Sequence, residues 1–276
     1  MFLPGFIIFK TMNGKHTPGR GKTGRFYIAD SHGCLLSFVK EARILAPVII
    51  SGHSILIVNM ALAIFDLDNT LLGGDSDHAW GDFLCKKGYV DATDHKAIND
   101  AFYEDYCRGE LDVYAYQRFA LAPLKGKTQE ELDVWHNEFM AEAIEALWLP
   151  KAFELLDHHK QLDDFLLIIT ATNSFVTAPI ARKLGVDDLI ATEPEIVNGR
   201  FTGEITGTPC YQTGKVTRLQ KWLNDNNENM IGSYFYSDSH NDLPLLEIVK
   251  NPVAVDPDAT LRRVAESRGW KIISLR

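Results

Sequence analysis

One stretch organises this sequence: Leu62-Ala63-Ile64-Phe65-Asp66-Leu67-Asp68-Asn69-Thr70. Its first four residues are apolar and predict a short buried strand, and two carboxylates follow directly at the end of that strand. Carboxylates two residues apart can converge on one divalent cation, while one serves as a nucleophile and the other carries a proton. Aspartate and threonine are common residues, so the stretch alone also fits an acidic surface turn.

Short apolar runs alternate with amphipathic segments from Leu62 to the end of the chain. The apolar runs predict strands at Leu62–Phe65, Phe165–Ile169, Tyr234–Tyr236, Val253–Val255 and Trp270–Ser274. Helices are predicted between them, for example at Phe175–Leu184, Thr213–Leu223 and Ala259–Arg268. Residues 195–205 predict a hairpin that turns at Asn198-Gly199. This order predicts an α/β fold, an open, parallel, Rossmann-like sheet with helices on both faces and with ligands at the carboxyl ends of the strands.

An insertion separates the first predicted strand from the second. Residues 76–149 are rich in apolar and aromatic side chains at spacings of three and four, which predicts a small helical bundle. Because this bundle follows the first strand directly, we expect it to cover that strand's carboxyl end as a cap. The core domain would then comprise residues 60–75 and 150–276. The repeated side chains are expected to form the core of the bundle: Phe83, Leu84, Phe102, Tyr103, Tyr106, Tyr116, Phe119, Trp135, Phe139, Ile144, Leu147 and Trp148.

The first 59 residues differ in composition from the rest. They hold seven lysines and arginines against two acidic residues, within a chain of net charge −9. Residues 1–59 are therefore predicted to be a basic extension, poorly ordered or dispensable. Residues 16–23 resemble a phosphate-binding P-loop but have His16 where its first glycine is needed, so no nucleotide site is predicted. Residues 44–58 are apolar but short and interrupted by Pro47, so no membrane anchor is predicted.

The overall composition narrows the class of function. A net charge of −9 lacks the basic face that a nucleic-acid partner needs, so a small-molecule ligand is favoured. The four cysteines form no C-x-x-C pair and the histidines no H-E-x-x-H motif, which argues against zinc. Scattered cysteines favour reduced thiols in the cytoplasm. A homodimer is left open.

Further polar residues follow the other predicted strands. Thr170 comes after the second strand, where its hydroxyl and the backbone N–H groups of a starting helix can cradle a phosphate. Asp238 and Asp242 follow the third strand and add two carboxylates, and Lys215 near the start of a helix supplies a positive charge. Since the carboxyl ends of parallel strands share one edge of a sheet, we expect these residues to meet Asp66 there.

The series Asp-x-Asp-x-Thr, Thr, Lys and Asp-x-x-x-Asp, in this order over residues 60–276, resembles the haloacid dehalogenase (HAD) superfamily. With a helical insertion after its first motif, the chain is most similar to the phosphoserine-phosphatase-like branch, subfamily IB. The resemblance implies a magnesium-dependent hydrolase of a small phosphate ester. Asp66 would attack phosphorus, and Asp68 would protonate the leaving oxygen and then activate water. Thr170 and Lys215 would neutralise the phosphoryl oxygens.

The same resemblance implies the metal ligands. Asp66, the main-chain carbonyl of Asp68 and Asp238 would ligate Mg²⁺, and Asp242 would support either the metal or a lysine beside it. Magnesium suits an all-oxygen site that also binds phosphate and water. Asn241 would reach the phosphate or the substrate.

Substrate specificity is indicated less clearly. The resemblance implies that Asp75, nine positions after the nucleophile, contacts a substrate amine, as a glutamate does in phosphoserine phosphatases. Arg118 resembles their cap arginine for the substrate carboxylate, and it equally fits a solvated surface charge. Thr170-Ala171-Thr172-Asn173 replaces their Ser-Gly-Gly run, and side chains at Thr172 and Asn173 would narrow the access for a carboxylate.

One further motif decides the ranking of substrates. Residues 74–78, Gly-Asp-Ser-Asp-His, are similar to a run in histidinol-phosphate phosphatases, whose substrate has an amine and an imidazole but no carboxylate. Together with the acidic balance of residues 75–148, this run favours histidinol phosphate over phosphoserine. A phosphotransferase and a non-catalytic phosphate-binding module stay open as alternatives. The presence of Asp68 argues against the binding module, because a relative without catalytic activity would not need an acid/base residue at this position.

Overall fold

The computed structural model describes residues 25–29, 35–39 and 61–276, and the chain divides into two units, Met1–Asn59 and Met60–Arg276. In the first unit, β1 (Arg25–Ala29) pairs antiparallel with β2 (Leu35–Val39). The P-loop-like residues 16–23 and the apolar residues 44–58 lie outside the described residues. Within the described part, no helix combines the length and the apolar character that a membrane crossing requires.

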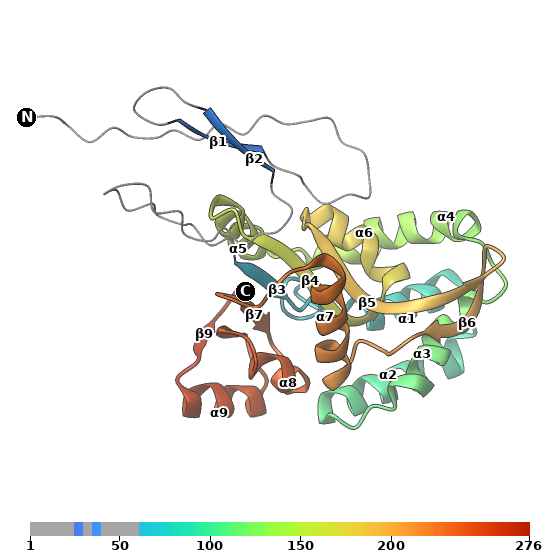
Figure 1. Cartoon of the computed structure of the whole chain (residues 1–276). Helices are drawn as coiled ribbons and strands as arrows, with labels where there is room; N and C mark the ends of the chain where they lie inside the picture. The colour runs from blue at the N-terminus through green and yellow to red at the C-terminus, as the bar shows by residue number, and fades with distance from the viewer. Residues whose placement is uncertain (1–24, 30–34, 40–60) are drawn as a thin grey trace, which may run out of the picture. The chain divides into compact units, whose positions relative to one another are not determined.

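A seven-stranded sheet forms the centre of the second unit (Figure 1). Its spatial order is β6-β5-β4-β3-β7-β8-β9, and every neighbouring pair is parallel except β5 with β6. The strands are β3 (Leu62–Phe65), β4 (Phe165–Asn173), β5 (Asp188–Val197), β6 (Arg200–Thr206), β7 (Tyr234–Ser237), β8 (Asn251–Val255) and β9 (Lys271–Ile273). The predicted α/β class with an open, mainly parallel sheet is confirmed.

Helices cover both faces of this sheet. They are α5 (Pro150–Gln161) and α6 (Ser174–Leu184) on one face, and α7 (Thr213–Asn226), α8 (Leu243–Leu246) and α9 (Ala259–Arg268) on the other. Ala63 and Phe65 of β3 pack into the first core, and Leu62 and Ile64 pack into the second. Alternation of apolar side chains between two cores explains why β3 is a continuous apolar run.

The strand order reverses beside β3. The chain runs outward from β3 to β4 and β5, and it then returns to the opposite side of β3 with β7, β8 and β9. In an open α/β sheet, ligands bind at such a switch point, outside the carboxyl ends of the strands. Asp66 follows β3 and Asp238 follows β7, so the topology brings both carboxylates to this point.

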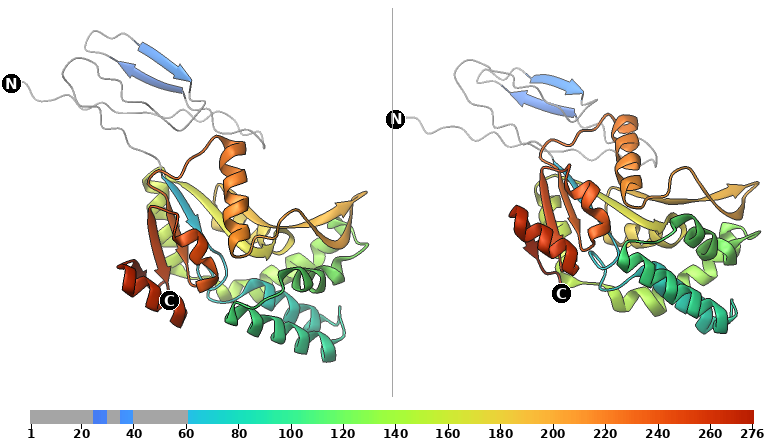
Figure 2. Two further views of the ribbon diagram at one scale, coloured as in Figure 1. Left: turned by 60° about the horizontal axis from the view of Figure 1, so that its bottom comes forward. Right: turned by 90° about the horizontal axis from the view of Figure 1, so that it is seen from below.

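The insertion after β3 consists mainly of helices, and Figure 2 shows them gathered at the end of the sheet toward which β3 runs. Its elements are α1 (Ser76–Lys87), α2 (Ala92–Arg108), α3 (Val113–Leu121), η1 (Ala122–Leu124), α4 (Gln129–Phe139), η2 (Met140–Ile144) and η3 (Glu145–Leu147). Leu72 pairs with Trp148 in an isolated bridge, and the Gly73 N–H donates to the Leu147 carbonyl at 2.8 Å. These contacts tie the two ends of the insertion together.

The aromatic side chains of the insertion form two groups, where a single bundle core was predicted. Phe83 and Phe139 are buried and pack around Trp80. Four others are only partly buried and line a cavity: Phe102, Tyr103, Tyr106 and Tyr116. Helical spacing marks the face of a helix that is turned away from solvent, but it does not tell whether a packed core or a cavity lies behind that face.

One local feature agrees with the prediction, and another differs from it. The β5–β6 hairpin turns at Asn198 (φ 52°) and Gly199 (φ 76°), the left-handed pair that a type I′ turn requires. Strand β4, by contrast, continues to Asn173 instead of ending at Ile169, with a register shift against β5 between these two residues. Thr170 therefore lies within a strand rather than at a helix start.

Candidate active site

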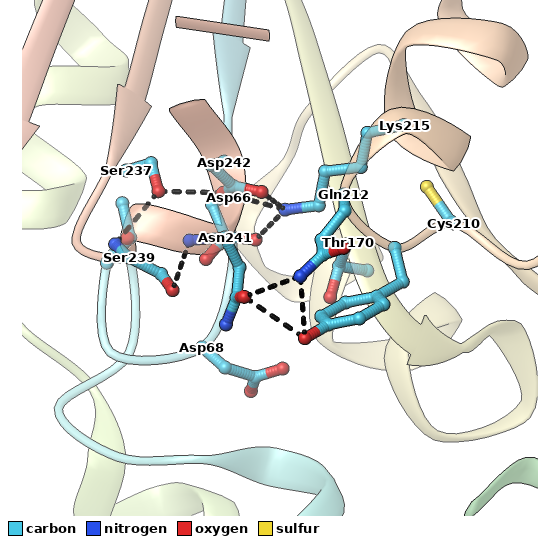
Figure 3. A network of polar contacts seen from close by, with 12 residues as sticks. Asp66, Asp68, Thr170, Cys210, Gln212, Lys215, Ser237, Ser239, Asn241 and Asp242 are labelled. Atoms are coloured by element: carbon cyan, nitrogen blue, oxygen red, sulfur yellow. Dashed lines mark hydrogen bonds and ion pairs between the residues drawn. The ribbon is translucent and has the colours of Figure 1, made fainter. Parts of the chain in front are cut away.

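Two carboxylates share one buried ammonium at the switch point of the sheet (Figure 3). The Lys215 Nζ lies 2.7 Å from Oδ1 of Asp66 and 2.8 Å from a carboxylate oxygen of Asp242. The Ser237 hydroxyl donates to the same Asp242 carboxylate at 2.7 Å. Burial alone lowers the pKa of Lys215, but the charges of Asp242 and Asp66 outweigh burial and raise the pKa above its usual value. The ammonium is therefore held in its charged form.

The position of Lys215 depends on a tight turn into α7. A Cβ atom on Gly214 would lie 2.1 Å from the Pro209 carbonyl oxygen, so only glycine fits there. Gln212, just before the helix, has φ 49° and ψ −119°, a conformation that side-chain-bearing residues rarely adopt. Such strain persists only where surrounding contacts impose it, and the Gln212 amide donates to Oδ1 of Asn241 at 3.0 Å.

Asp66 and Asp68 are held in different surroundings. The Asp66 backbone N–H donates to the Tyr236 carbonyl at 2.9 Å, next to the β3–β7 ladder. Asp68 accepts one hydrogen bond on each oxygen, from the Ser76 N–H at 2.7 Å and from the Thr172 hydroxyl at 2.8 Å. Burial raises the pKa of both carboxyls to about 7. Asp68 can therefore gain or lose a proton near neutral pH, which suits an acid/base.

Asp238 is fixed by a reciprocal pair of hydrogen bonds. The Thr70 hydroxyl donates to its Oδ1 at 3.0 Å, and its own backbone N–H donates to the Thr70 oxygen at 3.1 Å. Burial, followed by the charges of Asp66 and Asp242, raises the pKa of Asp238 well above its usual value. Mutual repulsion of the carboxylates is thus part of the site's electrostatics.

The donor set fits a hard divalent cation. Asp66, Asp238 and Asp242 set three carboxylates against one ammonium, that of Lys215. An excess of oxygen ligands at a largely buried site is the environment that Mg²⁺ prefers in proteins. The residues that would hold the ion are Asp66, Asp238 and the main-chain carbonyl of Asp68. Asp242 already binds Lys215 and Ser237, so it would act as a support.

A second group of potential metal ligands lies in the insertion. Single ligand atoms of His78, Asp82 and Asp100 lie within 4.8 Å of one another. The Lys96 Nζ lies 3.2 Å from Asp82 and 3.3 Å from Asp100, so a side-chain cation already neutralises these carboxylates. This group is partly exposed and does not include any of the predicted ligands, and we assign no metal to it.

A cavity adjoins Asp66 and Asp68 and is also lined by residues of the insertion, by Thr170 and by Thr172. Thr170 is buried, and its hydroxyl oxygen accepts from the Thr172 N–H at 3.2 Å. Asp75, predicted to contact a substrate amine, also lines the cavity. It caps the start of α1. The structure thus brings Asp75 together with the two aspartates of the first motif.

The other three predicted substrate residues do not line the cavity. Arg118 is exposed, and the cavity-facing residue of α3 is its neighbour Gln117, because adjacent residues of a helix point in different directions. Asn173 is buried and uses its side chain to cap α6, accepting from the Val176 N–H at 3.2 Å. Asn241 is buried as well, and its side-chain contacts join the core to the insertion.

Those contacts form a small latch, which we define as Asn241 and Gln212 together with the end of α2. The Asn241 amide donates to the Tyr106 carbonyl at 3.0 Å, and the Gln212 amide donates to the Gly109 carbonyl at 3.3 Å. The Tyr211 hydroxyl also donates to Oδ1 of Asn241 at 3.0 Å. The start of α7 and the 3-10 helix η4 (His240–Asp242) thus hold the C-terminal end of α2 beside the carboxylate cluster.

Residues 63–247 match the family model of haloacid dehalogenase-like hydrolases. The chain belongs to this family. A histidinol-phosphatase of Neisseria meningitidis serogroup C (strain 8013) is 46% identical over 219 residues, which cover 78% of this chain and 99% of that protein. A phosphoserine phosphatase of Mycobacterium tuberculosis (strain ATCC 25618 / H37Rv) is 35% identical over 220 residues, which cover 78% of this chain and 71% of that protein.

Solved structures share this fold. A protein of unknown function from Bordetella pertussis Tohama I is 45% identical, with a TM-score of 0.74, and the match covers 78% of this chain and 99% of that one. A phosphoserine phosphatase solved as a phospho-aspartyl intermediate analogue has a TM-score of 0.58 over 78% of this chain and 93% of that one. At 16% identity this second likeness shows the fold alone. The family match and the two named relatives confirm the predicted resemblance to the HAD superfamily and the predicted enzyme class: this HAD-like hydrolase is a phosphatase.

Sequence reasoning missed several residues that shape the site of this HAD-like phosphatase. Thr172 was expected only to narrow access, yet it donates to Asp68. Asp77 is buried and lines the cavity, and its only signal was its place in the Gly-Asp-Ser-Asp-His run. No sequence motif pointed to Gln117 or Gln212, because each acts through a hydrogen bond to a segment distant in sequence.

Proposed function

We propose that this HAD-like phosphatase is a Mg²⁺-dependent phosphomonoester hydrolase that forms an aspartyl-phosphate at Asp66. Histidinol phosphate is its first candidate substrate and phosphoserine the second. One observation carries the proposal: the Asp66 carboxylate lies 2.7 Å from the Lys215 ammonium, and it lines the same cavity as Asp68. The nucleophile and the proton carrier therefore line one cavity, and the positive charge for phosphoryl oxygens lies directly beside the nucleophile.

In the first step, a carboxylate oxygen of Asp66 forms a bond to phosphorus as the ester P–O bond breaks. Asp68 gives its proton to the leaving oxygen, so the leaving group departs as a neutral alcohol. A pKa of about 7 allows Asp68 to hold that proton at neutral pH. The Lys215 ammonium and the Thr170 hydroxyl stabilise the charge on the phosphoryl oxygens.

In the second step, Asp68 takes a proton from the water that attacks phosphorus, and the bond between phosphorus and Asp66 breaks. Inorganic phosphate leaves, and both carboxyls return to their starting states. The hydrogen bonds from Ser76 and Thr172 keep the Asp68 carboxyl oriented through both steps. When bound by Asp66, Asp238 and the main-chain carbonyl of Asp68, Mg²⁺ would supply positive charge that offsets the negative charge of the phosphoryl group.

The cavity wall supports a leaving group that carries positive charge. Among the described residues that line the cavity, four are aspartates and none is lysine or arginine. A substrate carboxylate would face Asp75 and Asp77 without a lysine or arginine of the cavity wall to pair with, because Arg118 is exposed and does not line the cavity. An ammonium group would be attracted by the same wall. This contrast ranks histidinol phosphate above phosphoserine, in agreement with the name of the Neisseria relative.

A comparison of substrates tests the proposal. The purified full chain is assayed with histidinol phosphate, phosphoserine and p-nitrophenyl phosphate, with Mg²⁺ and with a chelator. We expect hydrolysis only with Mg²⁺ and the highest kcat/KM for histidinol phosphate. Faster turnover of phosphoserine would reverse the ranking, and metal-independent turnover would remove the proposed role of Mg²⁺. Adding an acceptor alcohol separates the alternative: a phosphotransferase would yield a new ester, whereas the proposed hydrolase releases inorganic phosphate.

A further inference from the structure

Two buried hydrogen-bond acceptors of the cavity wall lack a partner within the described part of the chain. They are Oδ1 of Asp77 on α1 and Oε1 of Gln117 on α3. Asp77 is 6% exposed and Gln117 is 1% exposed. Buried polar atoms are almost always hydrogen-bonded, and leaving one without a partner costs about 1–3 kcal/mol. Two such atoms of the same kind in one cavity call for a common explanation.

Both acceptors are held in place by their other contacts. The Gln117 amide N–H₂ donates to the Ala171 carbonyl at 3.4 Å. Turning the amide over would set Oε1 against that carbonyl oxygen, so Oε1 stays directed elsewhere. The Asp77 backbone N–H donates to Oδ1 of Asp75 at 3.0 Å, which fixes Asp77 at the start of α1. Asp77 and Gln117 line the same cavity, so the start of α1 and this part of α3 face one space.

The surroundings define the ligand chemistry that these atoms accept. The Gln117 carbonyl oxygen can only accept, and the Asp77 oxygen accepts when its carboxyl is ionised, so a ligand that pairs with both offers N–H or O–H donors. The Asp77 oxygen belongs to a carboxyl group, and no lysine or arginine is among the described residues of the cavity wall. A cationic donor is therefore preferred over a neutral or anionic one. The rest of this wall carries aromatic rings, which favour a flat or cationic group. They belong to Phe102, Tyr103, Tyr106 and Tyr116.

We propose that Asp77 and Gln117 form a recognition subsite for a flat, cationic ring that carries two N–H groups, of the imidazolium type, on the leaving group of the substrate. The proposal rests on the proposed function and adds a second specificity element to it. Asp75, which caps α1 nearer to Asp68, would bind the substrate amine. Asp77 and Gln117 would bind the ring, one N–H to each acceptor.

Substrate pairs that differ only in the ring test this subsite. Histidinol phosphate is compared with its analogue in which phenyl replaces imidazole, so that amine and phosphate stay the same while both N–H groups are lost. The wild-type chain should prefer the imidazole compound by tenfold or more in kcat/KM, and Asp77→Asn should reduce that preference by about tenfold. Asp82→Asn is the matched control, since it removes the same charge from the exposed side of α1 and should leave the preference unchanged.

A second variant and the turnover of p-nitrophenyl phosphate distinguish failure of the subsite from failure of the proposed function. Gln117→Leu should reduce the preference as well, and it keeps the test valid if Asp77→Asn does not fold. Equal rates for both ring compounds in the wild type, with normal turnover of p-nitrophenyl phosphate, would overturn the subsite and leave the hydrolase intact. Loss of turnover on every ester would instead count against the proposed function. In that case calorimetry measures the binding of histidinol and of its phenyl analogue to the wild-type chain and to Asp77→Asn. A histidinol affinity that Asp77→Asn weakens about tenfold upholds the subsite. Equal affinities of the wild-type chain for histidinol and for the phenyl analogue overturn it.

Discussion

The Lys215 Nζ lies 2.7 Å from Oδ1 of Asp66, although 149 residues separate the two in sequence. Both side chains are almost fully buried, so water is not available to solvate either charge in place of its partner. The pair joins the end of β3 to the start of α7 at the switch point of the sheet. It therefore couples the stability of the fold to the chemistry of the site.

Replacing Lys215 by methionine should reduce both stability and activity. Asp66 and Asp242 would remain buried without their cation, and breaking a buried ion pair costs about 3–5 kcal/mol. We expect that loss in urea unfolding at pH 8, together with a fall in kcat/KM of about 10²-fold or more. Lys221→Met on the exposed side of α7 is the control and should change stability by less than about 0.5 kcal/mol. Equal stability of the two variants would contradict the role given to the buried pair.

The stability of the metal-free protein should depend on pH through the same carboxyls. Burial raises the pKa of Asp66 and Asp68 to about 7, so the folded state binds protons that the unfolded state has released. Their contribution is fully present below about pH 4 and is lost as the pH rises through about 7. His136 and His159, whose pKa values burial lowers, act in the opposite direction. Comparison with an Asp66→Asn/Asp68→Asn variant by urea unfolding isolates the carboxyl contribution.

Magnesium should reverse that trend. Metal ligands must be deprotonated to bind, so added Mg²⁺ should stabilise the wild-type protein more at pH 8 than at pH 5. The measurement is the urea midpoint at both pH values, with Mg²⁺ and with a chelator. Stabilisation of equal size at both pH values, or in the double variant, would show that Mg²⁺ binds somewhere other than at these carboxylates.

The latch between core and insertion should control access to the cavity. Gln212→Ala removes the amide that donates to Gly109 and to Asn241, at about 0.5–1.5 kcal/mol for each hydrogen bond. We expect faster amide hydrogen exchange in residues 103–112 and a KM that rises about two- to tenfold. Gln220→Ala on the exposed side of α7 is the matched control. Unchanged exchange in Gln212→Ala would show that other contacts hold α2 in place.

A chain that begins at Met60 should fold and turn over substrate as the full chain does. Every strand of the seven-stranded sheet and every proposed site residue follows Met60. The Neisseria relative is matched over 99% of its length by 78% of this chain. We therefore expect equal thermal midpoints and equal kcat/KM for the two chains. Loss of solubility, or of most activity, in the shorter chain would contradict the proposal that residues 1–59 are dispensable.

The parallel sheet and the residues at its edge were predictable because buried parallel strands are continuous apolar runs with polar residues directly after them. Strand β3 has the predicted bounds, and Asp66 and Asp68 follow it as expected. The end of β4 was not predictable. Thr170 was predicted to lie at the start of a helix, yet the backbone stays extended to Asn173 through a register shift beside β5.

The cavity wall was less predictable, since it depends on how helices are rotated and packed. Arg118 and Gln117 are neighbours in sequence, and only packing of α3 decides which of them turns inward. Asn241 was expected to reach the phosphate or the substrate, but its amide donates to the Tyr106 carbonyl, 135 residues away. The partners of such polar side chains come from segments that no local pattern relates to them.

The most direct test of the central claim is to trap the phosphoenzyme. Wild-type, Asp66→Asn and Asp68→Asn chains are mixed with radiolabelled substrate and Mg²⁺ and quenched in acid, and borohydride reduction followed by mass spectrometry locates the acyl phosphate. We predict a label on Asp66 in the wild type and none in Asp66→Asn. With p-nitrophenyl phosphate, whose leaving group needs no proton, we predict a larger amount in Asp68→Asn, because the base that activates water is lost. Turnover without any trapped phosphoenzyme, or a label on another residue, would contradict covalent catalysis by Asp66.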